Sequence, residues 1–286
     1  MTINIMAATG QLGRRVVESL IQDGIDPDNL IVTVRDTDKA ERLFEVDFHI
    51  RYGDFDDHSS LLSAYQDSDT LLLITSMAPV EPRIQQFANA LSAAQAAGVR
   101  RVVFVSIQSC DPGSRFLMNP FYLYAESKLR LSDLNWTILR NGLYLDPVAD
   151  WAPELEEMGR LPYPVQWGKV AYISRDDLAR AAAAALMYEG AENRLYELTG
   201  PEAVSMTDLA KALSEVTGTH IAFDQVSDEE FARICRESGD SDYLVRTLLS
   251  MYEAIDRGEY ERVTDHVEQL TGEAPETVEA YLKRKL

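Results

Sequence analysis

Residues 5–13 point most directly to chemistry, because they place Gly10 and Gly13 directly after a short apolar run. Glycines at these positions allow the backbone to approach a phosphate and allow the following helix to pack tightly on a strand. A helix that begins there adds free N–H groups and the positive end of its dipole. The pattern predicts a loop that wraps a diphosphate, with contacts from Ala7, Thr9, Gly10, Gln11 and Leu12.

Ala7 stands where such loops usually have their first glycine. At positive φ an alanine costs about 1 kcal/mol or more, whereas at negative φ it only adds a methyl group near the ligand. The sequence leaves both alternatives open.

The end of the second apolar run, at residues 34–39, bears on which dinucleotide binds. A carboxylate there grips the adenosine ribose of NAD, whereas a cation accommodates the 2′-phosphate of NADP. Arg35 directly follows the run and Lys39 comes four residues later, so we favour NADP(H). Asp36 keeps NAD open, because a shift of one residue would make it the ribose ligand. A solvated ion pair within residues 35–39 is a further alternative.

Tyr124 and Lys128 have the Tyr-x-x-x-Lys spacing in which a lysine activates a tyrosine to pass a proton during carbonyl reduction. A two-residue pattern often occurs by chance, however. We therefore favour a helix with an exposed Lys128 and keep a catalytic Tyr124 as the alternative.

Composition argues against several other kinds of function. The 4 histidines are scattered, and the 2 cysteines, Cys110 and Cys235, are too far apart for a metal motif, so we predict no metal site and no disulfide framework. The net charge of −20, from 27 basic and 47 acidic side chains, disfavours nucleic acid, because phosphate contacts need clustered Lys and Arg. No apolar stretch approaches the roughly 20 residues of a membrane helix, and the N-terminus lacks the basic segment of a signal peptide. We expect a cytoplasmic protein.

The elements that must position these residues alternate between short apolar runs and longer amphipathic segments, a pattern typical of βα units. Most of the short runs are apolar throughout, as parallel strands covered on both faces are. They predict a Rossmann-type doubly wound parallel sheet of the α/β class. The predicted strands are residues 3–6, 30–34, 48–52, 71–75, 102–106 and 137–139.

After about residue 143 helical patterns predominate. An Ala-rich helix is predicted at residues 176–187 and a short strand at 195–198, and capping-box patterns at Ser205 and Ser227 open further helices. We expect an NAD(P)-binding domain and a smaller, mostly helical C-terminal lobe that closes over it, with the ligand in the cleft between them. The expected bounds are 1–142 for the domain, to which residues 170–200 return, and 143–286 for the lobe.

Eight segments, taken in their order and spacing, carry a family resemblance over nearly the whole chain: residues 8–13, 34–35, 52–57, 71–76, 93–99, 136–142, 174–179 and 196–200. In these the chain resembles the NmrA-like atypical short-chain dehydrogenases, most closely their NADPH-dependent quinone oxidoreductase branch. That branch lacks the tyrosine–lysine pair.

The resemblance implies further site residues. Asp54 and Phe55 would line the adenine, and three residues after the fourth strand would lie along the ribose and phosphates: Thr75, Ser76 and Met77. The edge of the nicotinamide pocket would be formed by Asn141, Gly142 and Tyr144. A core position for Phe55 and a hinge contact for Tyr144 remain alternatives. Arg175 and Asp177 are expected to form an ion pair at a helix start rather than to bind a ligand.

The activity that the resemblance implies is hydride transfer from NADPH to a quinone-like acceptor. Such an acceptor is already electrophilic, and hydride addition gives a stabilised anion that water can protonate, so no dyad is required. Asn141 would orient a carbonyl, Tyr144 would wall the pocket, and Tyr122 or Tyr124 would donate a hydrogen bond. Two alternatives stay open: a non-catalytic NmrA-like NADP-binding redox sensor that acts through a protein partner, and reduction of a carbonyl acceptor if Tyr124 is catalytic. A homodimer or a regulatory partner is equally left open.

Overall fold

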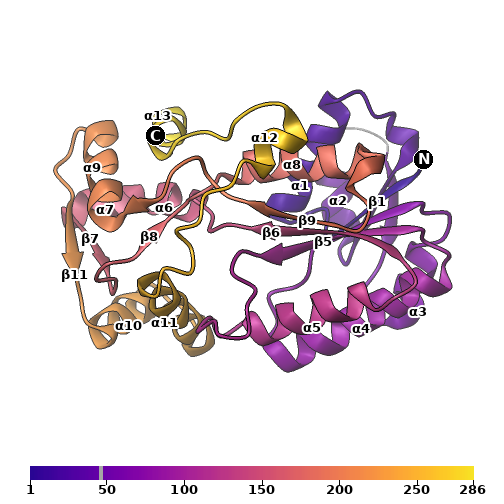
Figure 1. Cartoon of the computed structure of the whole chain (residues 1–286), viewed down its shortest axis with the longest axis horizontal. Coiled ribbons are helices and arrows are strands. Elements are labelled where there is room, and N and C mark those ends of the chain that lie inside the picture. Colours follow the sequence, from indigo (N-terminus) through magenta and orange to yellow (C-terminus); the bar gives the residue numbers. More distant parts are fainter. Residues whose placement is uncertain (45–47) are drawn as a thin grey trace. The chain divides into compact units, whose positions relative to one another are not determined.

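A seven-stranded sheet is the central element of the computed structural model, which describes residues 1–44 and 48–286 (Figure 1). The strand order is β3-β2-β1-β4-β5-β6-β9, so the chain winds outward from β1 in one direction and then in the other. The pairs β1–β2, β2–β3, β1–β4 and β4–β5 are parallel. The bounds are β1 (Ile3–Met6), β2 (Leu30–Val34), β3 (His49–Tyr52), β4 (Thr70–Leu73), β5 (Arg101–Ile107), β6 (Asn135–Asn141) and β9 (Arg194–Leu198).

Helices cover both faces of this sheet (Figure 1). One face carries α3 (His58–Ala64), α4 (Val80–Ala96) and α5 (Asn119–Arg130), and the other carries α1 (Gln11–Gln22), α2 (Thr37–Leu43) and α8 (Arg175–Met187). Because both faces are covered, residues of the central strands such as Ile5, Val32 and Leu72 are fully buried. The edge strand β3 is polar at His49 and Arg51 and exposed at both of its ends. Two short 3₁₀ helices, Pro27–Asn29 and Glu189–Ala191, complete this part.

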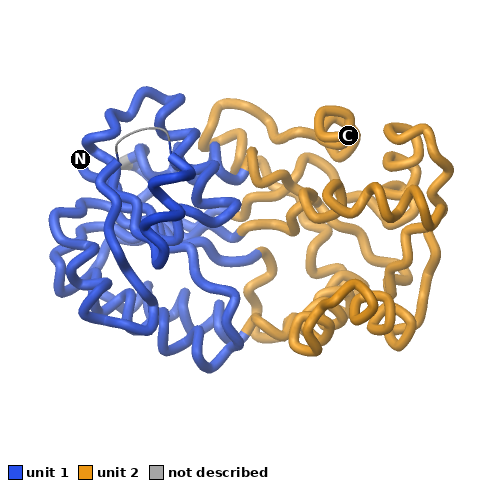
Figure 2. The backbone as a smooth tube through the Cα atoms, turned by 180° about the vertical axis from the view of Figure 1, so that it is seen from behind, with its two compact units in different colours: residues 1–107, 120–140, 178–196 blue, residues 108–119, 141–177, 197–286 orange. Residues whose placement is uncertain are grey.

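The chain divides into two compact units, which Figure 2 distinguishes by colour. The first unit comprises Met1–Ile107, Pro120–Arg140 and Leu178–Tyr196. The second unit comprises Gln108–Asn119, Asn141–Asp177 and Glu197–Leu286. The core of the first unit lies under α4 and α5, where Phe87 meets the rings of Phe104 and Phe121 edge to face, with ring centroids 5.1 and 6.2 Å away.

The second unit is mostly helical, with two small sheets. Its helices are α6 (Asp146–Asp150), α7 (Ala152–Met158), α9 (Met206–Thr217), α10 (Asp228–Glu237), α11 (Asp242–Asp256), α12 (His266–Thr271) and α13 (Val278–Lys285). In one sheet β7 (Arg160–Tyr163) pairs in parallel with β11 (Ala222–Gln225), and in the other β8 (Lys169–Val170) pairs antiparallel with β10 (Val204–Ser205). The predicted α/β class, with a Rossmann-type sheet and a mostly helical C-terminal part, is confirmed.

Most predicted elements lie where the sequence indicated, and the differences are at their ends. Residues 3–6 and 30–34 match β1 and β2. The strand predicted at 71–75 instead ends at Leu73, whose register partners are Met6 at the end of β1 and Phe104 on β5. Ser205 forms the complete predicted capping box with Asp208, and the Ser227 hydroxyl accepts the Glu230 N–H.

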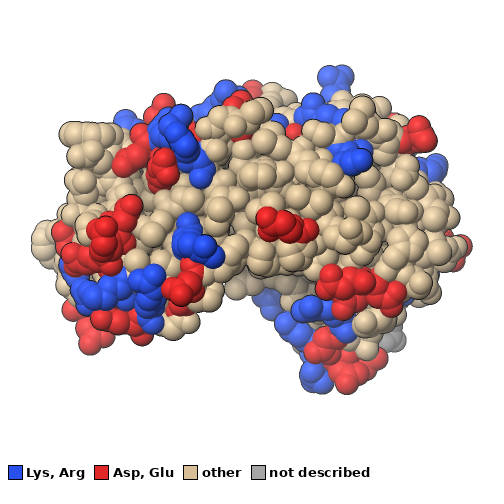
Figure 3. Space-filling view, turned by 90° about the horizontal axis from the view of Figure 1, so that it is seen from below, with Lys and Arg blue, Asp and Glu red and all other residues tan. Residues whose placement is uncertain are grey.

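Charged side chains of both signs lie beside each other on the face shown in Figure 3. Surface ion pairs such as Arg233–Glu237 at 3.0 Å and Arg236–Asp242 at 2.9 Å illustrate this mixing. Among the helices of the described residues, none is long and apolar enough to cross a bilayer.

Candidate functional site

Four strand ends bring the predicted residues of the first unit to one edge of the sheet. Because β3, β2, β1 and β4 are parallel neighbours, their carboxyl ends lie on the same side. Residues 7–10 follow β1 and Arg35 follows β2. Residues 54–55 come shortly after β3, and residues 75–77 come shortly after β4. In open α/β sheets ligands bind beyond this edge.

The loop after β1 is held by its own backbone. The Ala7 N–H donates to the Thr33 carbonyl at 2.9 Å, and the Gly10 N–H donates to the Ala7 carbonyl at 3.0 Å. Ala7 has φ of +63°, so the more costly of the two alternatives for this residue applies. Thr9 is half-buried, and Gly10 is exposed at the helix start, where no side chain of the described residues caps α1.

Gly13 explains why α1 approaches the loop so closely. A Cβ added there would lie 2.5 Å from the Ala7 carbonyl oxygen and 2.9 Å from the Ala8 Cα. The predicted tight packing of helix on strand is therefore present. The N–H groups of Gln11, Leu12 and Gly13 belong to the first turn of α1, whose four N–H groups have no partner within a helix. The Leu12 side chain is buried, so only its backbone is available to a phosphate.

Asp36 and Arg35 differ in what their side chains do after β2. The Asp36 carboxylate accepts the Lys39 N–H at 2.8 Å and caps α2. Arg35 directly precedes this cap and is exposed, as is Lys39. The carboxylate that kept NAD open in the sequence is thus engaged as a helix cap.

After β3 the chain turns at Gly53, where a Cβ would lie 2.5 Å from the Thr33 Cγ2. The Asp54 N–H donates to the Ser60 hydroxyl at 2.9 Å, and an Asp54 carboxylate oxygen accepts the Asp56 N–H at 3.0 Å. The Phe55 ring is only 6% exposed and lies in the core, which was the structural alternative for this residue. After β4, Thr75 and Ser76 are half-buried and Met77 is 79% exposed.

Tyr124 and Lys128 lie on α5 and are engaged with aromatic rings. The Tyr124 ring packs edge to face on Phe87 with centroids 6.5 Å apart, beside the core of the first unit. The Lys128 Nζ lies over the Tyr124 ring, 5.8 Å from its centroid, and Lys128 is exposed as favoured from the sequence. Between them Glu126 is buried, where it accepts the Ser106 hydroxyl at 2.7 Å and two bonds from Arg140 at 2.8 Å.

In the second unit Asn141 and Tyr144 are joined by a hydrogen bond. The Asn141 Nδ2 donates to the Tyr144 hydroxyl at 3.3 Å, and Asn141 is buried. The Arg175 guanidinium lies 4.9 Å from the centroid of the Tyr144 ring. Gly142 follows Asn141, and its N–H donates to the Leu198 carbonyl at 2.7 Å. A Cβ on Gly142 would lie 3.0 Å from that same oxygen, so a side chain would crowd this strand end.

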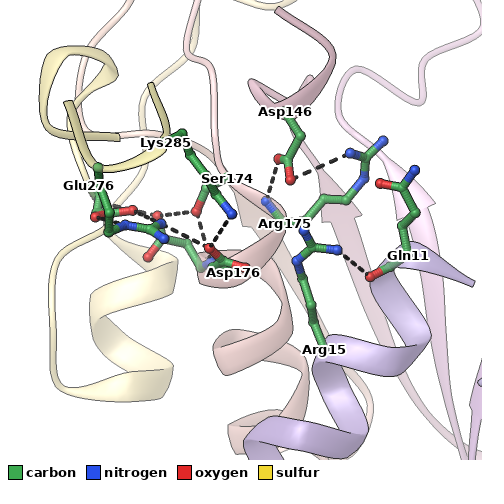
Figure 4. Close-up of polar contacts among 10 residues, drawn as sticks. Gln11, Arg15, Asp146, Ser174, Arg175, Asp176, Glu276 and Lys285 are labelled. Atoms are coloured by element: carbon green, nitrogen blue, oxygen red, sulfur yellow. Dashed lines mark hydrogen bonds and ion pairs between the residues drawn. The ribbon is translucent and has the colours of Figure 1, made fainter. Parts of the chain in front are cut away.

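Asp146 holds Arg175 in place (Figure 4). Its carboxylate accepts the Arg175 backbone N–H at 2.9 Å and pairs with the guanidinium at 3.5 Å. Burial and the neighbouring Asp146 carboxylate raise the pKa of Tyr281 on α13. Arg175 and Asp177 do lie at the start of α8, but each has its own partner, because Asp177 accepts the Ser174 hydroxyl at 2.8 Å. The predicted ion pair is therefore formed by Arg175 with Asp146 instead.

A family model described as NAD(P)H-binding matches residues 7–189, which include all of the strand ends described for the first unit. The chain belongs to this NAD(P)H-binding family.

Relatives of this NAD(P)H-binding chain include "Quinone oxidoreductase 2" from Escherichia coli (strain K12), 34% identical over 246 residues that make up 86% of this chain and 85% of that protein. An NmrA-like family domain-containing oxidoreductase from Aspergillus flavus is 27% identical and covers 95% of this chain and 90% of its own length. A crystal structure of an NADPH-dependent quinone oxidoreductase from Escherichia coli, complexed with NADPH, has a TM-score of 0.93 at 31% identity and covers 99% of both chains. The resemblance stated from the motifs is confirmed.

Two residues of this NAD(P)H-binding chain were not predicted from the sequence. Gln86, 8% exposed on α4, bonds both to Ser76 and to Asp56. Arg83, one turn earlier and 2% exposed, lies 5.0 Å from the centroid of the Phe121 ring, and its guanidinium contacts the Met77 sulfur at 3.7 Å. Both look like surface residues in the sequence. The neighbouring apolar residues Ile84 and Phe87 are the sequence signal that this side of the helix is buried.

Proposed function

We propose that this protein is an NADPH-dependent oxidoreductase that transfers hydride to a quinone-like acceptor. The observation that carries the cofactor preference is the division of roles after β2. Asp36 caps α2 through the Lys39 N–H at 2.8 Å, while Arg35 is exposed beside it. The cap bond holds one Asp36 carboxylate oxygen at the start of α2, which disfavours a ribose contact, and the exposed arginine suits a 2′-phosphate.

The diphosphate is assigned to the loop after β1. The uncapped start of α1 offers N–H groups, and Gly10 leaves that start open. We assign the Gln11 and Leu12 N–H groups to the phosphate oxygens and the Thr9 hydroxyl to a neighbouring oxygen, with Ala7 beside them. Arg35 and Lys39 would meet the 2′-phosphate. The adenosine and ribose would lie along Asp54, the Phe55 backbone, Thr75, Ser76 and Met77.

Bound NADPH supplies a hydride, which reduces the quinone to a hydroquinone anion that takes its proton from water. The protein's own task is to orient the acceptor and to limit the access of water. We assign Asn141 and Tyr144 to the acceptor, with Asn141 oriented by its 3.3 Å bond to the Tyr144 hydroxyl and Tyr144 stacked under Arg175. Gly142 follows Asn141 and lets the chain pass close to the Leu198 carbonyl. The name of the Escherichia coli relative supports a quinone as the acceptor class.

The experiment combines calorimetry with a turnover assay. NADP⁺ and NAD⁺ are titrated into the purified protein, and NADPH oxidation is then followed with menadione after subtraction of the rate without protein. We expect tighter binding of NADP⁺ and a rate that increases in proportion to protein concentration. Equal affinities for the two nucleotides would contradict the cofactor preference, and background rates with a panel of small quinones would contradict the acceptor.

A redox sensor that binds NADP(H) without turnover is the second candidate. The position of Lys128, whose Nζ lies over the Tyr124 ring, is compatible with it, because a sensor needs no proton-transfer pair. A sensor would bind NADP⁺ or NADPH with measurably different affinities and leave the quinone rate at background. The same two measurements therefore separate the candidates. For either one we also propose a cytoplasmic location.

A further inference from the structure

Gln86 joins two loops that are far apart in the sequence. Its Oε1 accepts the Ser76 hydroxyl proton at 2.5 Å, in the loop after β4. Its Nε2 donates to an Asp56 carboxylate oxygen at 3.0 Å, in the loop after β3. We propose that Gln86 is a positioning residue that holds these loops at the spacing needed by the adenosine half of NADP(H). The inference rests on the proposed cofactor site.

The bridge extends into both loops through further hydrogen bonds. On one side the Ser76 oxygen also accepts the Ala78 N–H at 3.2 Å, which closes the turn that carries Met77. On the other side the Asp56 N–H donates to Asp54 at 3.0 Å. The one amide therefore connects the residues assigned to the adenine with those assigned to the ribose. If it is removed, each loop keeps its local turn but loses this bridge to the other.

A second polar residue on the same face of α4 contacts one of the two loops. Asn89, three residues beyond Gln86, donates through its Nδ2 to the Phe55 carbonyl at 2.9 Å. Gln86 is 8% exposed, so its two bonds are made away from water, where a lost partner is costly. Residues three apart on a helix share a face, so both side chains can reach the same loop.

The arrangement also restrains a negative charge. Asp56 is an exposed residue whose carboxylate Gln86 ties to α4. Without that bond the Asp56 carboxylate is released from α4, and the turn that Asp56 forms with Asp54 loses its fixed position. Loss of Gln86 should therefore weaken binding of the phosphorylated adenosine half more than it weakens the fold.

The first test uses Gln86→Leu, with Gln95→Leu as the matched control. Gln95 lies on the same helix but is exposed. Binding of 2′,5′-ADP is measured by calorimetry and the melting temperature by calorimetric scanning. We expect Gln86→Leu to raise the Kd by about tenfold, in line with the loss of one buried hydrogen-bonded bridge. Gln95→Leu should leave the Kd within twofold.

The second variant, Gln86→Glu, gives a readout that a purely structural role would not change. A glutamate accepts the Ser76 proton, but its ionised carboxylate repels that of Asp56, and a hydrogen bond between the two forms only when one of them is protonated and donates. The ratio of the variant's Kd to the wild-type Kd should therefore fall as the pH is lowered from 7.5 to about 5.

The outcomes separate this inference from the proposed function. A wild-type protein that binds NADP⁺ and 2′,5′-ADP, with a Gln86→Leu Kd within twofold of it, would overturn the role of Gln86 alone. A Gln86→Glu ratio that is flat with pH would do the same, and it applies even if Gln86→Leu does not fold. A wild-type protein that binds neither ligand would overturn the cofactor preference and the role of Gln86 together.

Discussion

The loop after β1 and the loops after β3 and β4 lie at the same edge of the sheet but are held in different ways. The first is fixed by backbone hydrogen bonds from Ala7 and Gly10 and by the close approach of α1 at Gly13. The other two are tied together by the side chain of Gln86. The difference teaches that a loop held by backbone contacts can be recognised from a glycine pattern, whereas loops tied together by a buried side chain leave no local pattern in the sequence.

The strongest way to break the backbone-held loop is Gly13→Ala. The added Cβ would lie 2.5 Å from the Ala7 carbonyl oxygen, and this backbone atom cannot move away as the end of a flexible side chain can. We expect a loss of about 3 kcal/mol in the free energy of unfolding, together with loss of NADP⁺ binding. Denaturant titration and calorimetry measure the two effects.

Gly24→Ala is the control for that experiment. Gly24 has φ of +85° and open space around its Cβ position, so its substitution tests backbone strain without a clash. It should cost about 1 kcal/mol and leave NADP⁺ affinity unchanged. A Gly13→Ala protein as stable as Gly24→Ala would contradict the steric account.

Arg35→Ala sharpens the comparison by removing the proposed side-chain contact with the 2′-phosphate, next to the loop after β1. We expect the Kd for NADP⁺ to rise by about 10- to 100-fold because a charge-assisted contact is lost, while the Kd for NAD⁺ stays the same. Arg42→Ala removes the same charge from the last turn of α2 and should change neither affinity by more than twofold. A similar change for NAD⁺ and NADP⁺ would show that Arg35 does not meet the 2′-phosphate.

Ala7→Gly should stabilise the loop after β1. Because Ala7 has φ of +63°, a glycine there removes strain and should raise the free energy of unfolding by about 1 kcal/mol. Ala8→Gly, at the fully buried neighbouring residue, should instead be destabilising. Denaturant midpoints compare the two variants, and a less stable Ala7→Gly protein would mean that the methyl group packs usefully.

Tyr124→Phe should have the smallest effect. The Tyr124 ring packs on Phe87 and beneath Lys128, contacts that phenylalanine keeps. We expect kcat for quinone reduction to change by less than twofold. A large loss of kcat with unchanged KM would instead assign a proton-transfer role to Tyr124 and favour carbonyl reduction.

Features that depend on local periodicity were predicted well. The strands at 3–6 and 30–34 are short apolar runs that are buried along their whole length, and the Ser205 capping box is a contact between residues three apart. Strand ends were less predictable, as at Leu73, because the last residue of a strand depends on its pairing with neighbouring strands. Phe55 and Arg175 show the same limit for side chains: the core decides the first, and Asp146, 29 residues away, decides the second.

The sequence by itself determined the α/β class, the glycine-containing loop after the first strand and Arg35 as the candidate for the extra phosphate, because each depends on residue types that are adjacent or periodic. Only the tertiary structure decided that Ala7 is in a left-handed conformation, that Asp36 is used as a cap, and that Gln86 bridges two loops. A backbone angle or a buried bond is set by the residues that fold against it. Asp56 and Gln86 are 30 residues apart, and only the packing of α4 on the sheet makes them neighbours.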